Sequence, residues 1–150
     1  MIRGIAFLSL TIATLSAAAA AETFGGPVSA SVVEVVDGDT LSVKATVWLG
    51  IDVSTRVRIR GIDTPELHSS CAAEKAMAEA ARRRLAKIAG ETVNLTNVMD
   101  DKYGGRVDAD VANSAGVDLK AAMLATGLAH PYDGKGARAD WCPVASTSQK

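Results

Sequence analysis

The sequence has 150 residues, which is enough for one domain with a single hydrophobic core, and its formal charge is -1 at pH 7. This balance argues against a protein that holds nucleic acid through a generally basic surface, because phosphate neutralisation supplies most of the non-specific affinity. Any such binding must therefore depend on local clusters of charge and on a bound cation.

The first 21 residues have the features of a secretory signal peptide. Arg3 precedes an apolar run from Ile5 to Ala21, and alanines stand just before Glu22. An uncleaved membrane anchor is the alternative, but serines and threonines interrupt the run, which is short for a span of about 20 residues. Cleavage would remove one of the 16 basic residues and none of the 17 acidic ones, for a formal charge of -2. We expect export to the periplasm or the medium, without a membrane anchor.

Three β-strands are predicted before the first helix. Val28–Val36 is rich in β-branched residues and stops at Asp37-Gly38, a strong signal for a hairpin turn. A second strand is predicted at Thr40–Trp48. In the third, Thr55–Ile62, apolar and basic residues alternate, as in a strand with one buried side. The apolar face holds Val57 and Ile59, and the other face holds Arg56, Arg58 and Arg60.

The second half of the chain alternates helices with strands. Ala72–Ala89 is rich in alanine, carries larger apolar residues at helical spacing and is followed by Gly90, a natural helix stop. The remaining predicted elements are strands at Thr92–Val98 and Arg106–Ala112, joined by a turn, and a helix from Asp118 as N-cap to Thr126. This order predicts an α+β fold, a small five-stranded β-barrel of OB type with helices packed on it.

The two cysteines, Cys71 and Cys142, both lie in the part that would be exported, where an oxidising compartment favours a disulfide. The bridge would tie the start of the first helix to the C-terminal end and would restrict the unfolded chain. The alternative is two free or buried thiols. A metal site based on cysteine is not expected without further ligands.

Carboxylates and arginine gather in two short segments at the ends of predicted strands. One is Asp37-Gly38-Asp39-Thr40, and the other is Asp63-Thr64-Pro65-Glu66, which Arg58 precedes. Hard divalent cations prefer carboxylate and carbonyl oxygens, and guanidinium groups bind phosphate oxygens. If both segments meet at one end of the barrel, they would suit metal-assisted cleavage of a phosphodiester. Turn chemistry alone is the alternative for Asp37 and Asp39, because Asp-Gly favours hairpins in any case.

With Asp101-Lys102-Tyr103-Gly104 leading to Arg106, these segments form an ordered set. The set resembles the motif pattern of the thermonuclease, or staphylococcal-nuclease-like, family, and the likeness extends from about Val32 to Tyr132. The resemblance implies a nuclease domain at residues 22–143 with a polar tail at 144–150. The long third helix of the best-known members is expected to be missing, because residues 137–143 are too short to form it.

The resemblance also implies a function and the roles of individual residues. We expect a calcium-dependent nuclease that cleaves DNA and RNA and leaves 3′-phosphates, acting as a monomer with no stable protein partner. The implied Ca²⁺ ligands are Asp39, Asp63 and the carbonyl of Thr64; the implied catalytic residues are Arg58, Glu66 and Arg106; and the implied contacts to a terminal phosphate are Lys102 and Tyr103.

Some positions depart from the family pattern or leave alternatives open. Gly105 adds a residue before Arg106, so a looser turn must bring that arginine into place. Asp108 stands where an apolar strand residue is expected, and burying its carboxylate would be costly without a partner. Tyr132 either packs in a turn or contacts substrate. A non-catalytic OB-type binding module is the main alternative to the enzyme, although the chain has few aromatic residues on which bases could stack.

Overall fold

The computed structural model describes residues 22–101 and 104–142, and these follow the predicted order of elements closely. The predicted signal peptide (residues 1–21), Lys102, Tyr103 and residues 143–150 lie outside the described residues. The strands are β1 (Thr23–Phe24), β2 (Val28–Val35), β3 (Thr40–Trp48), β4 (Ile51–Ile59), β5 (Ile62–Asp63), β6 (Thr92–Asp100), β7 (Arg106–Asn113) and β8 (His130–Pro131), and the helices are α1 (Ala72–Ala89) and α2 (Leu119–Leu124).

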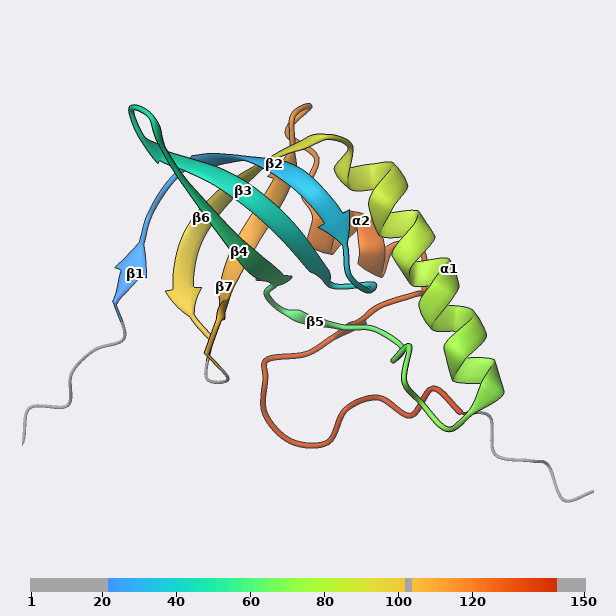
Figure 1. Ribbon diagram of the computed structural model, residues 1–150. Helices are drawn as coiled ribbons and strands as arrows, with labels where there is room; N and C mark the ends of the chain where they lie inside the picture. Colours follow the sequence, from blue (N-terminus) through green and yellow to red (C-terminus); the bar gives the residue numbers. More distant parts are fainter. Residues whose placement is uncertain (1–21, 102–103, 143–150) are drawn as a thin grey trace, which may run out of the picture.

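Five strands close into the predicted barrel (Figure 1). The strand order is β6-β2-β3-β4-β7, and a further antiparallel pairing of β6 with β7 closes the ring. β4 pairs with β7 in parallel, and the short β1 adds to β6. Alternation along β4 is as predicted, because Val57 and Ile59 are buried while Arg56 and Arg58, which alternate with them, are not. The chain therefore has the α+β barrel fold expected from its sequence.

The predicted third strand is in fact two separate strands. β4 begins earlier, at Ile51, and ends at Ile59, and the chain then turns at Gly61, whose φ is +86°. The following β5 leaves the barrel sheet and pairs with β8, with Asp63 opposite His130. Glycine adopts such a positive φ readily, so the chain can change direction between β4 and β5 at this residue. This turn carries Asp63 away from the β4 ladder and beside the C-terminal segment.

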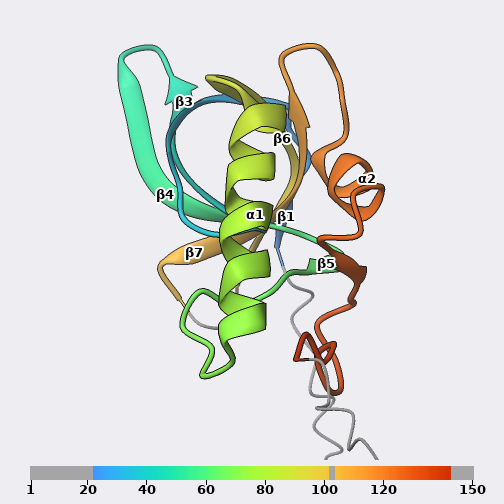
Figure 2. The same ribbon diagram turned by 90° about the vertical axis from the view of Figure 1, so that its right-hand side faces the viewer.

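Helix α1 packs against the barrel through a stripe of mostly small residues (Figure 2). Ala78, Ala81, Leu85 and Ala89 are buried, and small side chains let the helix axis approach the strands closely. Met77, one of the larger apolar residues at helical spacing, is half-buried. α2 lies beside α1, begins at Asp118 as predicted and buries Leu119 and Met123.

The described chain after β8, residues 132–142, contains no helix, in agreement with the predicted loss of the third helix. Trp141 is buried there, and its ring lies against that of His130, with 4.4 Å between centroids. This segment runs along the end of the barrel where β5 lies and returns toward the start of α1 (Figures 1 and 2). Within the described residues, no helix has the length and apolar character needed to cross a membrane.

Candidate active site

The turn between β2 and β3 packs tightly on the rest of the fold. A Cβ atom at Gly38 would lie 2.8 Å from both the Ala81 Cβ and the Thr64 Oγ1. No side chain fits in that space, so the turn requires glycine at this position. The close approach seats Asp37 and Asp39 against the segment that carries Thr64, and Asp37 Oδ1 accepts the backbone N–H of Asp39 at 3.0 Å.

Asp39 is a buried carboxylate paired with Arg58. It is 4% exposed, its Oδ1 accepts the Thr40 hydroxyl at 2.8 Å, and its Oδ2 accepts Arg58 Nη1. The other Arg58 nitrogen, Nη2, donates to the carbonyl of Ile62 at 2.9 Å. Burial and the neighbouring Asp37 raise the pKa of Asp39 to about 6, despite the opposing effect of Arg58. Burial is the largest cause, so the raised pKa reflects mainly the loss of water around this carboxylate.

Arg138, in the C-terminal segment, binds the second acidic segment, residues 63–66. Its Nε donates to Asp63 Oδ1 at 2.5 Å, its Nη2 donates to the carbonyl of Thr64 at 2.9 Å, and its Nη1 pairs with Glu66 Oε1. Asp63 is 1% exposed, and its other oxygen accepts the Trp141 Nε1–H at 3.3 Å. Burial lowers the pKa of Arg138, but the bonds to Glu66 and Asp63 outweigh it and raise the pKa overall.

Arg106 reaches the site from the start of β7. Its Nε pairs with Asp101 Oδ2, and the two residues also bond through their backbones, from Asp101 N–H to the Arg106 carbonyl at 3.2 Å. Gly104 and Gly105 have φ values of +68° and +66°, which accommodate the added glycine. The looser turn expected from the sequence thus leaves Arg106 on the same side of the barrel as Arg58.

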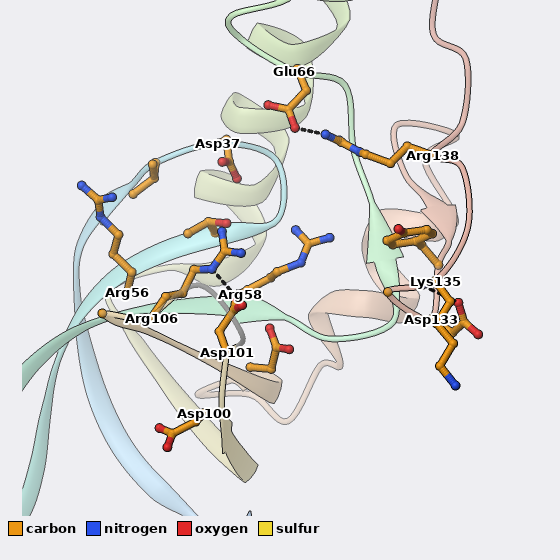
Figure 3. A pocket seen from close by; sticks show the side chains of 17 residues that line it. Asp37, Arg56, Arg58, Glu66, Asp100, Asp101, Arg106, Asp133, Lys135 and Arg138 are labelled. Atoms are coloured by element: carbon orange, nitrogen blue, oxygen red, sulfur yellow. Dashed lines mark hydrogen bonds and ion pairs between the residues drawn. The ribbon is translucent and has the colours of Figure 1, made fainter. Parts of the chain in front are cut away.

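These groups meet at one cleft of about 760 Å³ at the end of the barrel (Figure 3). Arg58 and Arg106 lie on the barrel side, and Arg138 points toward Glu66 from the C-terminal segment. The described residues that line the cleft include five basic and six acidic side chains. Asp39 and Asp63 lie behind the arginines with which they pair. The cleft is therefore highly charged: the Arg58 and Arg106 side chains are partly exposed, whereas their partners Asp39 and Asp101 are buried.

Asp108 also lines the cleft, in the register position opposite Arg58 on the parallel pair β4–β7. Among the described residues, its Oδ1 is the buried side-chain oxygen for which no hydrogen-bond partner is found. Burial and the nearby Asp101 raise its pKa. The unexpected strand carboxylate thus faces the arginines, whose charges reduce the cost of burying it.

The oxygen donors fit a hard divalent cation. Within the described residues, no three acidic, histidine or cysteine side chains are grouped closely enough to form a metal cage by themselves. Three oxygens nevertheless surround one positive group, because Asp63 Oδ1, the Thr64 carbonyl and Glu66 Oε1 all accept hydrogen bonds from the Arg138 guanidinium. Carboxylate and carbonyl oxygens of this kind are the ligands that Ca²⁺ prefers, completed by water. Asp39, which is buried and paired with Arg58, is a further carboxylate of the site.

Sequence analysis missed two residues that organise the site, Arg138 and Glu74. Glu74, in the first turn of α1, accepts the backbone N–H of Glu66 at 3.0 Å and the Ser69 hydroxyl at 2.6 Å. Its position three residues after the helix N-cap was an available signal, because acidic residues are favoured there. Arg138 lies in a segment without periodicity, and nothing in the sequence pointed to it.

Cys71 and Cys142 lie close together as free thiols, beside Glu74. A hydrogen bond between the two thiols lowers the pKa of Cys71 and raises that of Cys142 to about 12. Cys71 is the N-cap residue of α1, where backbone N–H groups also stabilise a thiolate. The disulfide therefore stays a prediction.

The sequence was also compared with known proteins. Residues 56–141 match the sequence profile of the family described as staphylococcal nuclease homologue. The chain belongs to this family. A search of curated proteins finds no match.

The matched region of this staphylococcal nuclease homologue includes Arg58, the segment from Asp63 to Glu66, Arg106 and Arg138. Asp39 lies before it, and its position in the site rests on the Gly38 turn and on its pairing with Arg58. The roles of the site residues stay predictions, and Lys102 and Tyr103 lie outside the described residues. Tyr132 lines the cleft, and its hydroxyl donates to the carbonyl of Gly136 at 3.2 Å.

Proposed function

We propose that this staphylococcal nuclease homologue is an exported, Ca²⁺-dependent nuclease that hydrolyses DNA and RNA and leaves 3′-phosphates. The observation that supports it best is the convergence of Arg58, Arg106 and two acidic segments on one charged cleft. Membership of the family supports the reaction class.

Arg58 and Arg106 would bind the substrate phosphate. A guanidinium offers several N–H donors in a fixed plane, which suits the oxygens of a phosphate that gains negative charge during attack by water. Both arginines already pair with buried or nearly buried carboxylates, Asp39 and Asp101, which hold the guanidinium groups in place. These ion pairs therefore position the donors before substrate arrives.

Asp39, Asp63 and the carbonyl of Thr64 would hold the cation, whose charge stabilises the phosphate oxygens during attack when it is bound. Glu66 would accept a proton from the attacking water, since its side chain is about half exposed and borders the cleft. Its backbone N–H donates to Glu74, which fixes the segment relative to α1. The carboxylate itself is therefore free to turn between Arg138 and a water molecule.

Digestion of single-stranded DNA and RNA by the purified protein, with Ca²⁺ or with EDTA, tests the proposal. We expect cleavage with Ca²⁺ and fragments that a 3′-phosphatase shifts on a gel. Glu66→Gln should lower the rate by roughly 10²- to 10⁴-fold, the usual contribution of a general base. Glu79→Gln is the matched control, because Glu79 pairs with Arg82 on the exposed face of α1.

Arg58→Lys keeps the charge but loses the planar fork, so we expect a rate loss of roughly 10²- to 10³-fold with little change in folding. Arg83→Lys, on α1, is its control and should cleave like the wild type. Wild-type turnover in Arg58→Lys would remove that residue from the mechanism. Absence of cleavage by a folded wild-type protein would favour the non-catalytic nucleic-acid-binding module.

A further inference from the structure

The C-terminal segment brings its own cation to the acidic residues of the cleft. The three donor nitrogens of Arg138 bind Asp63 Oδ1, the Thr64 carbonyl and Glu66 Oε1. Two of these oxygens belong to residues proposed as cation ligands, and the third belongs to the proposed general base. One side chain thus occupies groups that the reaction requires for other purposes.

The segment is fixed on both sides of Arg138. Before it, the Tyr132 backbone N–H donates to the Gly61 carbonyl at 3.0 Å, and β8 pairs with β5. After it, Trp141 is buried against His130 and donates to the second oxygen of Asp63. Between these anchors the described backbone has no helix or strand. The arginine is therefore held near the acidic residues, while its long, 40% exposed side chain can rotate away without unfolding the segment.

The charges explain why such a cation is needed. Asp63 is almost fully buried, and a buried carboxylate without a partner is strongly unfavourable. A divalent cation and the guanidinium would both offset its charge, but they cannot occupy the same oxygens. Each must therefore weaken binding of the other, because a site that is partly closed has a reduced apparent affinity.

We propose that Arg138 sets the affinity of the cleft for its divalent cation, by occupying Asp63, Thr64 and Glu66 in the cation's absence and leaving them when the cation binds. The proposal rests on the cation site of the proposed function. In this way the apo protein keeps its buried carboxylate paired, and the general base is released only when the cation is present.

Ca²⁺ affinity is the direct test. The chain has two tryptophans, so in a Trp48→Phe background the emission of Trp141, which donates to Asp63, reports on the site. Trp48 is 71% exposed at the β3–β4 hairpin, away from the cleft. Calorimetric titration with Ca²⁺ gives the same dissociation constant independently of the emission. We expect Arg138→Gln to bind Ca²⁺ more tightly, by about 5- to 150-fold, the usual range of coupling between two sites.

Lys135→Gln is the matched control. Lys135 lines the same cleft and carries the same charge, but it lies apart from Glu66 in Figure 3. The long-range field of the lost charge is then similar in both variants, and only Arg138→Gln vacates the oxygens. An equal affinity change in the two variants would overturn the proposal, as would weaker Ca²⁺ binding by Arg138→Gln or no Ca²⁺ binding by any variant.

Thermal unfolding keeps the test valid if Arg138→Gln is unstable. We expect its Tm in EDTA to fall below that of the wild type, and Ca²⁺ to raise its Tm by more than it raises the wild-type Tm. A loss of structure that Ca²⁺ does not reverse would mean that Arg138 is only a structural clamp. These results are distinguishable from the nuclease test, because a wild-type protein that cleaves while both variants bind Ca²⁺ alike would refute this proposal and leave the proposed function standing.

Discussion

Gly38→Ala probes the contact that seats the first acidic segment. The added Cβ would lie 2.8 Å from the Ala81 Cβ and from the Thr64 Oγ1, and 2.9 Å from the Thr64 Cβ. Ordinary contacts between such atoms are about 3.5 to 4.0 Å, so each neighbour overlaps by roughly an ångström. Neither can turn aside, because Ala81 and Thr64 are buried. The β2–β3 turn must move, at a cost of about 1–3 kcal/mol as for other overpacked sites.

The assay for this variant is urea or thermal unfolding, together with the cleavage rate. A cost of that size should lower Tm by roughly 3–10 °C. Movement of the turn also shifts Asp39 from Thr64, so the rate should fall in the variant even where it is fully folded. Gly25→Ala is the control, because nothing lies within 4 Å of a Cβ there. We expect it to leave Tm and the rate nearly unchanged.

A double-mutant cycle identifies the atom responsible. Ala81→Gly removes one of the overlapping carbons, at its own helix-propensity cost of about 1 kcal/mol. In that background Gly38→Ala should cost less than it does alone, because the two positions are in contact. If Gly38→Ala is as stable and as active as the wild type, or if the two costs simply add, the close-approach argument is refuted.

Three further predictions concern the predicted disulfide, the N-cap of α2 and the hydrophobic core. Under oxidising conditions Cys142→Ser should lower Tm by roughly 10 °C, because it removes the predicted bridge to Cys71. Mass spectrometry of the wild type should show the loss of two hydrogens. Equal Tm values for the variant and the wild type would mean that both thiols are free. Asp118→Ala should cost about 1 kcal/mol in urea unfolding, because the Asp118 side chain accepts the Ala121 N–H at 3.2 Å, and Asp118→Asn should recover most of that loss. Leu85→Ala should lower the free energy of unfolding by about 2–5 kcal/mol, since Leu85 is fully buried between α1 and the barrel. A smaller loss would mean that the surrounding core collapses into the cavity.

Local signals in the sequence determined most of the elements. The period of two along Val57 and Ile59, the Asp-Gly turn and the Asp118 cap each depend on residues close in the chain, so they could be read without the fold. The bounds of α1 and β3 agree with the prediction for the same reason.

Contacts between distant segments were decided only by the tertiary structure. The sequence pointed to Arg58, Arg106 and two acidic segments as candidates, but not to the pairing of Asp39 with Arg58. Nor did it indicate that Asp108 faces the arginines across the parallel β4–β7 pair. Such pairings depend on the register of strands far apart in the chain, and the residue patterns within each strand do not specify it.

Arg138 is the clearest case of this difference. Its segment has no helical or strand periodicity, and the Asp133-Gly134 turn signal does not indicate where the arginine lies. β5–β8 pairing and the burial of Trp141 nevertheless bring it to Asp63, Thr64 and Glu66. The sequence alone therefore determined the fold class and indicated carboxylates and arginines as candidates for the site. The tertiary structure decided which cation lies among its carboxylates, because that depends on where the chain returns in space.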